Sequence, residues 1–380
     1  MKSLLQTVFA AWRALWWRGF QWLALPWRWL FALLGSRGSG QSPAAGAPKD
    51  DTADAPDTPD TPDTGPVSAA NVPATRRSAT RIGTFTTGSF RNDAGERDYK
   101  LYVPAGKPEG KLPLVVMLHG CKQDPDDFAA GTRMNALADR EPMLVLYPAQ
   151  TRAANPYACW NWFSRHDQQP DAGEPAIIAG MVQDVLARQP ADPQRVYVAG
   201  LSAGGAMAAI LAHTHPALFA AVGVHSGLAH GAAQDVVTAL GVMKRGPGQR
   251  AAPREGRDGA TPSAALPLIV FHGDHDKTVH PLNGERVVEQ ALAVVAGAGA
   301  SRTGVAEPGQ VPSGRAYTRT VYGRAGEARG AAVEHWLVHG CGHAWSGGDA
   351  AGSFTDPLGP DASAQMLRFF LQHRSAGRAG

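Results

Sequence analysis

The chain has 380 residues, and 44% of them are hydrophobic, which suits one large globular domain with extensions. Its formal net charge of +3 is too small to indicate a nucleic-acid-binding protein. Three cysteines allow at most one internal disulfide, and neither a C-x-x-C nor an H-E-x-x-H spacing occurs, so we expect no metal site and no cofactor.

Residues 1–34 are rich in tryptophan and are interrupted by arginine. The arginines break the run of about 18 uncharged residues that a membrane-spanning helix needs. Leu5, Trp12 and Trp16 fall on one half of a helical wheel, and basic residues such as Arg13 fall on the other. Two interpretations stay open: a helix that lies in a membrane or polymer-granule surface, or an atypical export signal.

Residues 35–79 are predicted to form a disordered linker, because Asp-Thr-Pro units repeat from Asp57 to Thr64 and no apolar face recurs. A single folded domain is predicted over residues 80–374, followed by a flexible tail at 375–380.

Within the folded domain, short apolar strands alternate with helical segments. Strands are expected at 81–85, 98–103, 112–118, 143–147, 195–199, 219–224, 268–271 and 334–338, helices at 177–187, 205–211 and 362–373, and surface insertions at 241–265 and 297–314. This alternation predicts an α/β fold with a mostly parallel central sheet and helices on both faces.

Gly200-Leu201-Ser202-Ala203-Gly204 fits G-x-S-x-G, a strained turn that lifts a serine out of the sheet between a strand and a helix. The apolar strand before it and the small-residue helix after it are the expected context, so Ser202 is the candidate nucleophile. The alternative is a serine in an ordinary strand-to-helix turn.

His119-Gly120-Cys121 follows the predicted strand at 112–118. In a parallel sheet the chemistry gathers beyond the carboxyl ends of the strands, so this turn is expected beside the serine. The backbone N–H groups of Cys121 and Ala203 are the expected oxyanion hole. The alternative is an ordinary glycine turn.

The loops after two later strands carry a candidate acid and a candidate base. Asp274 and Asp276 compete for the acid; Asp276 has the better reach towards a histidine, while Asp274 follows a turn glycine and suits a capping role. His343 lies between small residues, as a mobile base needs, and His339 fits the turn at the end of the strand.

Ser202, Asp276 and His343 then occur in the chain order of α/β-hydrolase triads. In such a triad the histidine accepts the serine proton and later protonates the leaving alcohol, while the aspartate holds the imidazole tautomer.

Five segments together resemble the poly(3-hydroxybutyrate) depolymerase family of esterases, which also includes feruloyl and acetylxylan esterases. The segments are residues 118–121, 159–163, 200–205, 271–276 and 342–348. The resemblance covers roughly Gly83 to His373 and implies an α/β-hydrolase fold and ester hydrolysis through the triad, often by secreted enzymes. It does not extend to residues 1–34.

The family pattern also suggests that Cys121 and Cys159 form a disulfide, which would favour an oxidising compartment; the alternative is two buried thiols. The indoles of Trp160, Trp162 and Trp345 are a possible apolar platform for substrate, and buried core tryptophans are the alternative.

The sequence therefore predicts a serine esterase that hydrolyses poly(3-hydroxybutyrate)-type polyester or its oligomers through an acyl-enzyme. The alternatives are a feruloyl or acetylxylan esterase, or a surface-binding protein that coats a granule or membrane through residues 1–34. The resemblance implies an extracellular or periplasmic location, with an intracellular membrane or granule surface as the alternative.

Overall fold

A computed structural model describes residues 82–106, 110–247, 266–296, 303–323 and 332–375. The predicted N-terminal helix, the predicted linker, residues 248–265 and 297–302 of the two predicted insertions, and residues 376–380 lie outside these described residues.

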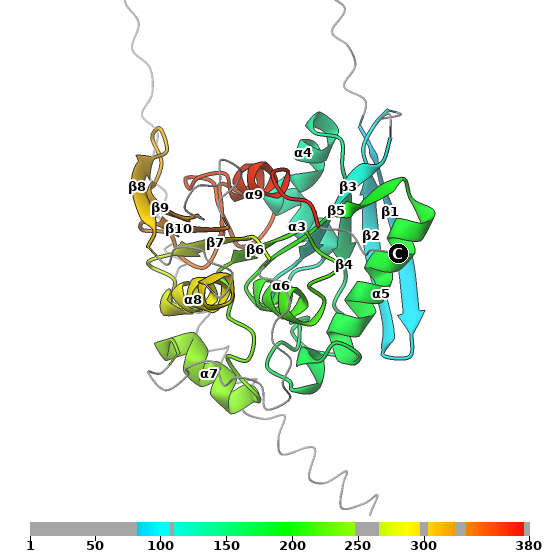
Figure 1. The fold of residues 1–380 in the computed structure, drawn as a ribbon, viewed down its shortest axis with the longest axis horizontal. Helices are drawn as coiled ribbons and strands as arrows, with labels where there is room; N and C mark the ends of the chain where they lie inside the picture. Colours follow the sequence, from blue (N-terminus) through cyan, green and yellow to red (C-terminus); the bar gives the residue numbers. More distant parts are fainter. Residues whose placement is uncertain (1–81, 107–109, 248–265, 297–302, 324–331, 376–380) are drawn as a thin grey trace, which may run out of the picture. The chain divides into compact units, whose positions relative to one another are not determined.

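One twisted sheet of ten strands runs through the described domain, in the order β1-β2-β4-β3-β5-β6-β7-β10-β9-β8 (Figure 1). The strands are β1 (Thr84–Asn92), β2 (Gly95–Val103), β3 (Leu112–Leu118), β4 (Leu144–Pro148), β5 (Ala191–Leu201), β6 (Ala221–His225), β7 (Leu268–Gly273), β8 (Val305–Gln310), β9 (Ala316–Tyr322) and β10 (Val333–Val338). The six central strands from β4 to β10 are parallel, and an antiparallel pair is added at each side. A small parallel pair, β11 (Trp345–Ser346) with β12 (Thr355–Asp356), lies apart from the main sheet.

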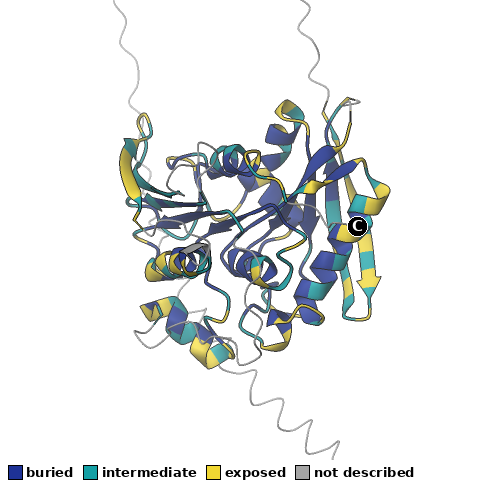
Figure 2. Ribbon diagram, viewed as in Figure 1, coloured by how far each residue is buried: buried dark blue, intermediate teal, exposed yellow. Residues whose placement is uncertain are grey.

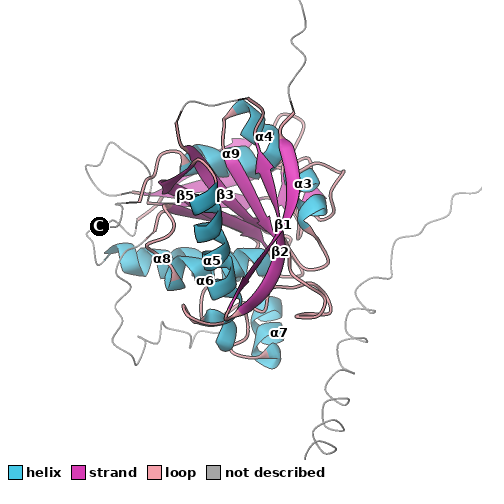
Figure 3. Cartoon of the chain, turned by 90° about the vertical axis from the view of Figure 1, so that its right-hand side faces the viewer, coloured by secondary structure: helices cyan, strands magenta, loops and turns pink. Residues whose placement is uncertain are grey.

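Helices cover both faces of the sheet, as the sequence predicts (Figures 1 and 3). They are α3 (Pro125–Thr132), α4 (Met134–Arg140), the short η1 (His166–Gln168), α5 (Gly173–Arg188), α6 (Ala203–Thr214), α7 (Val236–Arg245), α8 (Leu282–Ala296) and α9 (Ala362–Phe370). Helices α5, α6 and α8 pack on one face, while α3, α4 and α9 pack on the other. The prediction of an α/β fold with a mostly parallel sheet is confirmed.

The central strands are buried on both faces because their sequences are continuous apolar runs (Figure 2). All seven residues of β3 and all five of β4 are buried. Helix α6 packs closely on the sheet through small residues: a Cβ atom on Gly205 would lie only 2.9 Å from the carbonyl oxygen of Gly200. This rigid centre fixes the positions of the loops at the carboxyl ends of the strands.

The two segments predicted as surface insertions contain part of a helix and a strand. Residues 241–245 complete α7, whose first turn is capped by the Asp235 side chain. Residues 305–310 form β8, which pairs with β9 and extends the sheet beyond β10. Strand β8 is almost wholly exposed, so its sequence lacks the buried alternation that would have identified it.

Candidate active site

Ser202 occupies a sharp turn between β5 and α6, with φ 58° and ψ −117°. A non-glycine residue at positive φ is strained, and such strain gathers at functional turns. The turn requires glycine on both sides. A Cβ atom would lie 2.4 Å from the Gly204 carbonyl oxygen if placed on Gly200, and 2.0 Å from the Leu118 carbonyl oxygen if placed on Gly204.

The backbone N–H of Ser202 donates to the His225 carbonyl at the end of β6 (2.9 Å), which anchors the turn to the neighbouring strand. Ala203 is the first residue of α6, and the first-turn N–H groups of a helix have no acceptor within the helix. The Ala203 N–H therefore stands beside the serine at the positive end of the helix dipole.

Asp276 and His343 lie together, although 67 residues separate them along the chain. His343 Nδ1 lies 2.7 Å from Asp276 Oδ2, and the Asp276 side chain is fully buried while that of His343 is 12% exposed. The other carboxylate oxygen, Oδ1, accepts the backbone N–H groups of Thr278 and Val279, both at 2.8 Å. The carboxylate thus has a fixed orientation, with Oδ2 turned towards His343.

The environment keeps Asp276 ionised. Burial acts to raise the pKa of Asp276, but hydrogen bonds from His272 and His343 outweigh it and hold this pKa well below its usual range. The His343 imidazole accordingly faces a permanent negative charge at Nδ1, which favours the tautomer that leaves Nε2 free to accept a proton.

The competing aspartate makes a similar pair with a different histidine. Asp274 Oδ2 lies 2.9 Å from His339 Nδ1, and Asp274 Oδ1 accepts the Gly340 N–H at 2.7 Å. His339 Nε2 lies 2.9 Å from the Thr318 hydroxyl of β9 and is thereby occupied. Asp274 therefore secures the turn after β10, as its position behind a turn glycine predicts.

The turn after β3 lies against the serine. A Cβ atom on Gly120 would be 3.6 Å from Ser202 Cβ. The Gly120 N–H donates to Gln123 Oε1 (3.0 Å), and the Gly120 carbonyl lies 2.8 Å from His119 Nδ1. Cys121 thus belongs to a loop whose backbone is held rigidly beside the nucleophile turn.

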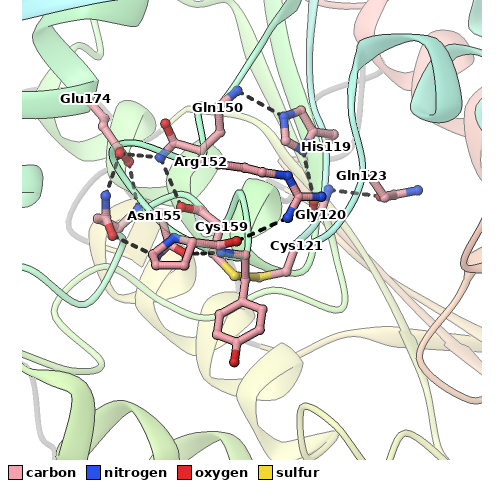
Figure 4. Close-up of a disulfide and its surroundings, with 12 residues drawn as sticks. His119, Gly120, Cys121, Gln123, Gln150, Arg152, Asn155, Cys159 and Glu174 are labelled. Carbon is pink, nitrogen blue, oxygen red and sulfur yellow. Dashed lines mark hydrogen bonds between the residues drawn. A yellow bond between two sulfur atoms is a disulfide. The ribbon is translucent and has the colours of Figure 1, made fainter. Parts of the chain in front are cut away.

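Cys121 and Cys159 form a disulfide with an S–S distance of 2.05 Å (Figure 4). The bond ties the turn after β3 to the segment before η1, and the Lys122 N–H donates to the Tyr157 carbonyl across the same junction (2.7 Å). Cys341 is a free, buried thiol.

The three tryptophans proposed as a substrate platform are all buried. Trp160 is 0% exposed, Trp162 5% and Trp345 1%, so none presents an open indole face. Trp345 stacks on His225 with ring centroids 5.0 Å apart, and its Nε1 donates to Ser363 Oγ. Their placement corrects the platform interpretation and favours the alternative of core tryptophans.

Two buried histidines beside the site were not predicted. His225 Nε2 accepts the Ser346 N–H at 2.9 Å, and burial, followed by the charges of His272 and His343, holds its pKa well below the usual value. His272 Nε2 lies 2.8 Å from the Val279 carbonyl and 3.4 Å from Asp276 Oδ2. His225 is brought beside the site by the pairing of β6 with β7, whereas His272 precedes Asp276 by only four residues along the chain.

Within the described part of the chain, no group of three or more His, Cys, Asp or Glu side chains is arranged to hold a metal ion. None of the helices there combines the length and the apolar character required to cross a membrane.

A mostly parallel sheet that carries a serine on the turn between a central strand and its helix defines the α/β-hydrolase class. The structure of an acetyl xylan esterase from Aspergillus awamori supports this fold assignment, with a TM-score of 0.58 at 20% identity over 76% of this chain and 99% of that one.

Residues 97–311 match the family described as "Esterase PHB depolymerase", and the chain belongs to that family. The resemblance predicted from the sequence is thereby confirmed, and membership places the chain among the esterases.

Two relatives illustrate the breadth of the family. The chain is 33% identical over 230 residues to poly(3-hydroxyalkanoate) depolymerase C of Paucimonas lemoignei, covering 58% of this chain and 54% of that protein. It is 29% identical over 283 residues to feruloyl esterase B of Neurospora crassa, covering 71% and 86%. The chain thus spans about half the length of the depolymerase.

Proposed function

We propose that the protein is a serine esterase in which Ser202, His343 and Asp276 form the catalytic triad. The observation that carries this proposal is the 2.7 Å contact between His343 Nδ1 and the buried Asp276 carboxylate. It occurs in a chain whose only G-x-S-x-G serine stands on the strained turn after β5.

In the first half-reaction, Ser202 Oγ attacks the carbonyl carbon of the ester while His343 Nε2 takes the hydroxyl proton. The ionised Asp276 stabilises the imidazolium that forms. The tetrahedral intermediate collapses, the bond to the alcohol oxygen breaks, and His343 gives its proton to the departing alcohol, which leaves an acyl-serine.

The negative charge on the intermediate's oxygen is stabilised by the N–H groups of Cys121 and Ala203. Gly120, which lies against Ser202, places the first donor, and the start of α6 supplies the second. In the second half-reaction, water attacks the acyl-serine with His343 as base. The acid product leaves, and the serine regains its proton.

The substrate proposed first is poly(3-hydroxybutyrate)-type short-chain polyester or its oligomers. The family description and the 33% identity to a poly(3-hydroxyalkanoate) depolymerase support it. A second candidate is an acylated plant polymer that carries feruloyl or acetyl groups. It is favoured by one observation: the alignment with feruloyl esterase B reaches 86% of that protein's length.

We further propose that the enzyme works in an oxidising compartment, extracellular or periplasmic. The Cys121–Cys159 disulfide supports this location, because such bonds persist outside the reducing cytoplasm. Residues 1–34 would either direct export or hold the enzyme on a membrane or polymer granule.

The test is hydrolysis of polyhydroxybutyrate, acetylated xylan, methyl ferulate and soluble p-nitrophenyl butyrate by wild type and Ser202→Ala. Loss of the nucleophile is expected to reduce turnover on the order of 10⁶-fold without unfolding the protein. A Ser202→Ala variant that keeps a tenth of the wild-type rate would exclude the assignment. A well-folded wild type with no activity on the panel would favour the surface-binding alternative.

A further inference from the structure

The orientation of one peptide group decides whether the Cys121 N–H can serve as an oxyanion donor. In a trans peptide, the N–H points opposite to the preceding carbonyl. The Gly120 carbonyl is held by two groups: His119 Nδ1 at 2.8 Å and the Gln123 N–H at 3.3 Å. Whatever fixes His119 therefore aims the Cys121 N–H.

His119 is itself held by the main chain of Gln150. The Gln150 N–H donates to His119 Nε2 (3.1 Å), so this nitrogen is an acceptor and the proton resides on Nδ1, which donates to the Gly120 carbonyl. Burial lowers the pKa of His119, which keeps the ring neutral in this tautomer.

The Gln150 side chain has every hydrogen-bonding group in use, and Figure 4 shows the two bonds that its Nε2 donates. Its Nε2 donates to the Cys159 carbonyl (2.9 Å) and to Glu174 Oε1, while its Oε1 accepts Arg97 Nε (2.8 Å) and the Thr151 N–H (3.0 Å). A fully satisfied buried amide has one orientation, so Gln150 is a rigid support for His119.

Glu174, in the first turn of α5, is the centre of this network and is 2% exposed. Asn161 donates to both of its oxygens, through the main-chain N–H to Oε2 (2.7 Å) and through Nδ2 to Oε1 (2.8 Å). Asn161 follows Cys159 by two residues, so one carboxylate supports both the disulfide segment and the residue that orients His119.

These contacts close a ring. One path runs from Glu174 through Gln150 and His119 to the peptide between Gly120 and Cys121. The other returns through the disulfide and the segment from Cys159 to Asn161.

We infer that Glu174 is a positioning residue for ester hydrolysis: its ionised carboxylate braces the oxyanion loop from behind and keeps the Cys121 N–H aligned for the transition state. This inference depends on the proposed oxyanion role of Cys121. Glu174 touches no reacting atom, and its effect travels through Gln150 and Asn161.

The charge on Glu174 matters because every hydrogen bond that its carboxylate makes is accepted from a donor, on Arg97, Gln150 or Asn161. The charged groups that face it are Arg97 of β2, at 3.4 Å, and Asp167 of η1. Burial and the charge of Asp167 raise the pKa of Glu174 to about 7, against the opposing effects of Asn161, Gln150 and Arg97. Protonation of Glu174 would turn its O–H towards these donors and weaken the closed network of contacts that runs through Gln150, His119 and the disulfide.

The test is Glu174→Gln. Whichever carboxylate oxygen the new amide nitrogen replaces, it faces a donor, Asn161 N–H on one side or Gln150 Nε2 and Asn161 Nδ2 on the other. With p-nitrophenyl butyrate, kcat should fall about 10- to 100-fold while KM stays within about threefold, since only transition-state stabilisation is lost. The Ki of n-butylboronic acid, which forms a tetrahedral adduct with serine, should rise in parallel.

Glu334→Gln is the matched control. Glu334 is 1% exposed and accepts hydrogen bonds from Arg319, Arg368 and Trp336 Nε1, but it lies at the opposite, amino end of β10. Both variants should lower the melting temperature, whereas only Glu174→Gln should change kcat and the boronate Ki. A folded Glu174→Gln enzyme with wild-type kcat would overturn the inference.

The pH profile provides a readout that a purely structural role would not move. In wild type, the fall of kcat/KM on the acid side should reflect two protons, one on the base and one on Glu174. In Glu174→Gln it should reflect one, and in Glu334→Gln two. Equal slopes in wild type and Glu174→Gln would count against the inference.

Gln150→Met keeps the test decisive if Glu174→Gln does not fold. It removes the amide but preserves the side-chain volume and the main-chain N–H to His119. A drop in kcat of about three- to tenfold is expected, and an unchanged kcat would overturn the inference. Ser202→Ala shows whether the proposed function itself has failed. In that case Ser202→Ala would retain activity, and the variants of Glu174 and Gln150 would not change that activity.

Discussion

Replacing Asp276 by Asn tests the triad and the choice between two aspartates. The Asp276 Oδ1 atom accepts two backbone N–H groups at 2.8 Å, from Thr278 and Val279. In the variant, the amide oxygen must stay with these donors, so the amide nitrogen takes the place of Oδ2 and points at His343 Nδ1. A donor there forces the imidazole proton onto Nε2, where it blocks acceptance of the Ser202 proton.

The expected loss in kcat is roughly 10⁴-fold, equivalent to about 5 kcal/mol of transition-state stabilisation. Steady-state hydrolysis of p-nitrophenyl butyrate at pH 7 measures it. Asp274→Asn is the control. It makes the same carboxylate-to-amide change in the same loop, but at a carboxylate that contacts a different histidine, His339. That variant should stay within about threefold of wild type.

The reasoning is refuted if Asp274→Asn is the more damaging change, or if Asp276→Asn keeps more than about 1% of the rate, since a wrong tautomer cannot be that active.

The pH dependence of protein stability offers a second check on Asp276. Because the pKa of Asp276 is lowered in the folded protein, its carboxylate stabilises the fold above the ordinary Asp pKa of about 4. This contribution is lost as the pH falls through the folded value, so the stability gap between wild type and variant should narrow in acid.

Three further predictions concern other parts of the chain. Gly204→Ala should destabilise the fold by at least about 3 kcal/mol, because its Cβ would meet the rigid Leu118 carbonyl at 2.0 Å; urea unfolding measures this. Replacing both Cys121 and Cys159 by Ala should lower the free energy of unfolding by about 4 kcal/mol for a separation of 38 residues, and a loss below about 1 kcal/mol would contradict the estimate. Deleting residues 1–79 should leave hydrolysis of a soluble ester unchanged but reduce recovery on polyester granules or lipid vesicles, and mass spectrometry showing that the mature chain begins well after residue 34 would exclude the anchoring role.

The sequence predicted the parallel centre of the fold well because that part is dictated by local pattern. Strand β3 matches its predicted range, since a short apolar run of seven residues is typical of a strand buried on both faces. The strands at the β8 edge of the sheet were harder to predict from the sequence. Strand β9 is partly exposed along its whole length, and β8 is stabilised by pairing with β9 rather than by burial, so hydrophobic pattern carries little signal for either.

The candidate site was likewise predictable only where local sequence pattern carries a signal. The strand-end turns identified Ser202, Asp276 and His343 as candidates, and the structure brings the last two together. Their catalytic roles stay predictions. The bracing role of Glu174 had no signal, because Gln150 and Asn161 reach it only after β4, α5 and the disulfide segment have packed together.

Among the residues that the structure describes, β1 and β8 are the outer strands of the sheet, and no further strand pairs with their outer edges there. Such edges invite a second chain to pair and aggregate, and an enzyme that gathers on an insoluble polymer would meet its own copies at high local concentration. Strand β8 carries Pro308, which has no N–H to offer, next to the charged Glu307. Pro308 and Glu307 therefore protect the β8 edge, so copies crowded on a surface should not pair through β8. Replacing Pro308 and Glu307 by Val should make the protein aggregate at concentrations that wild type tolerates.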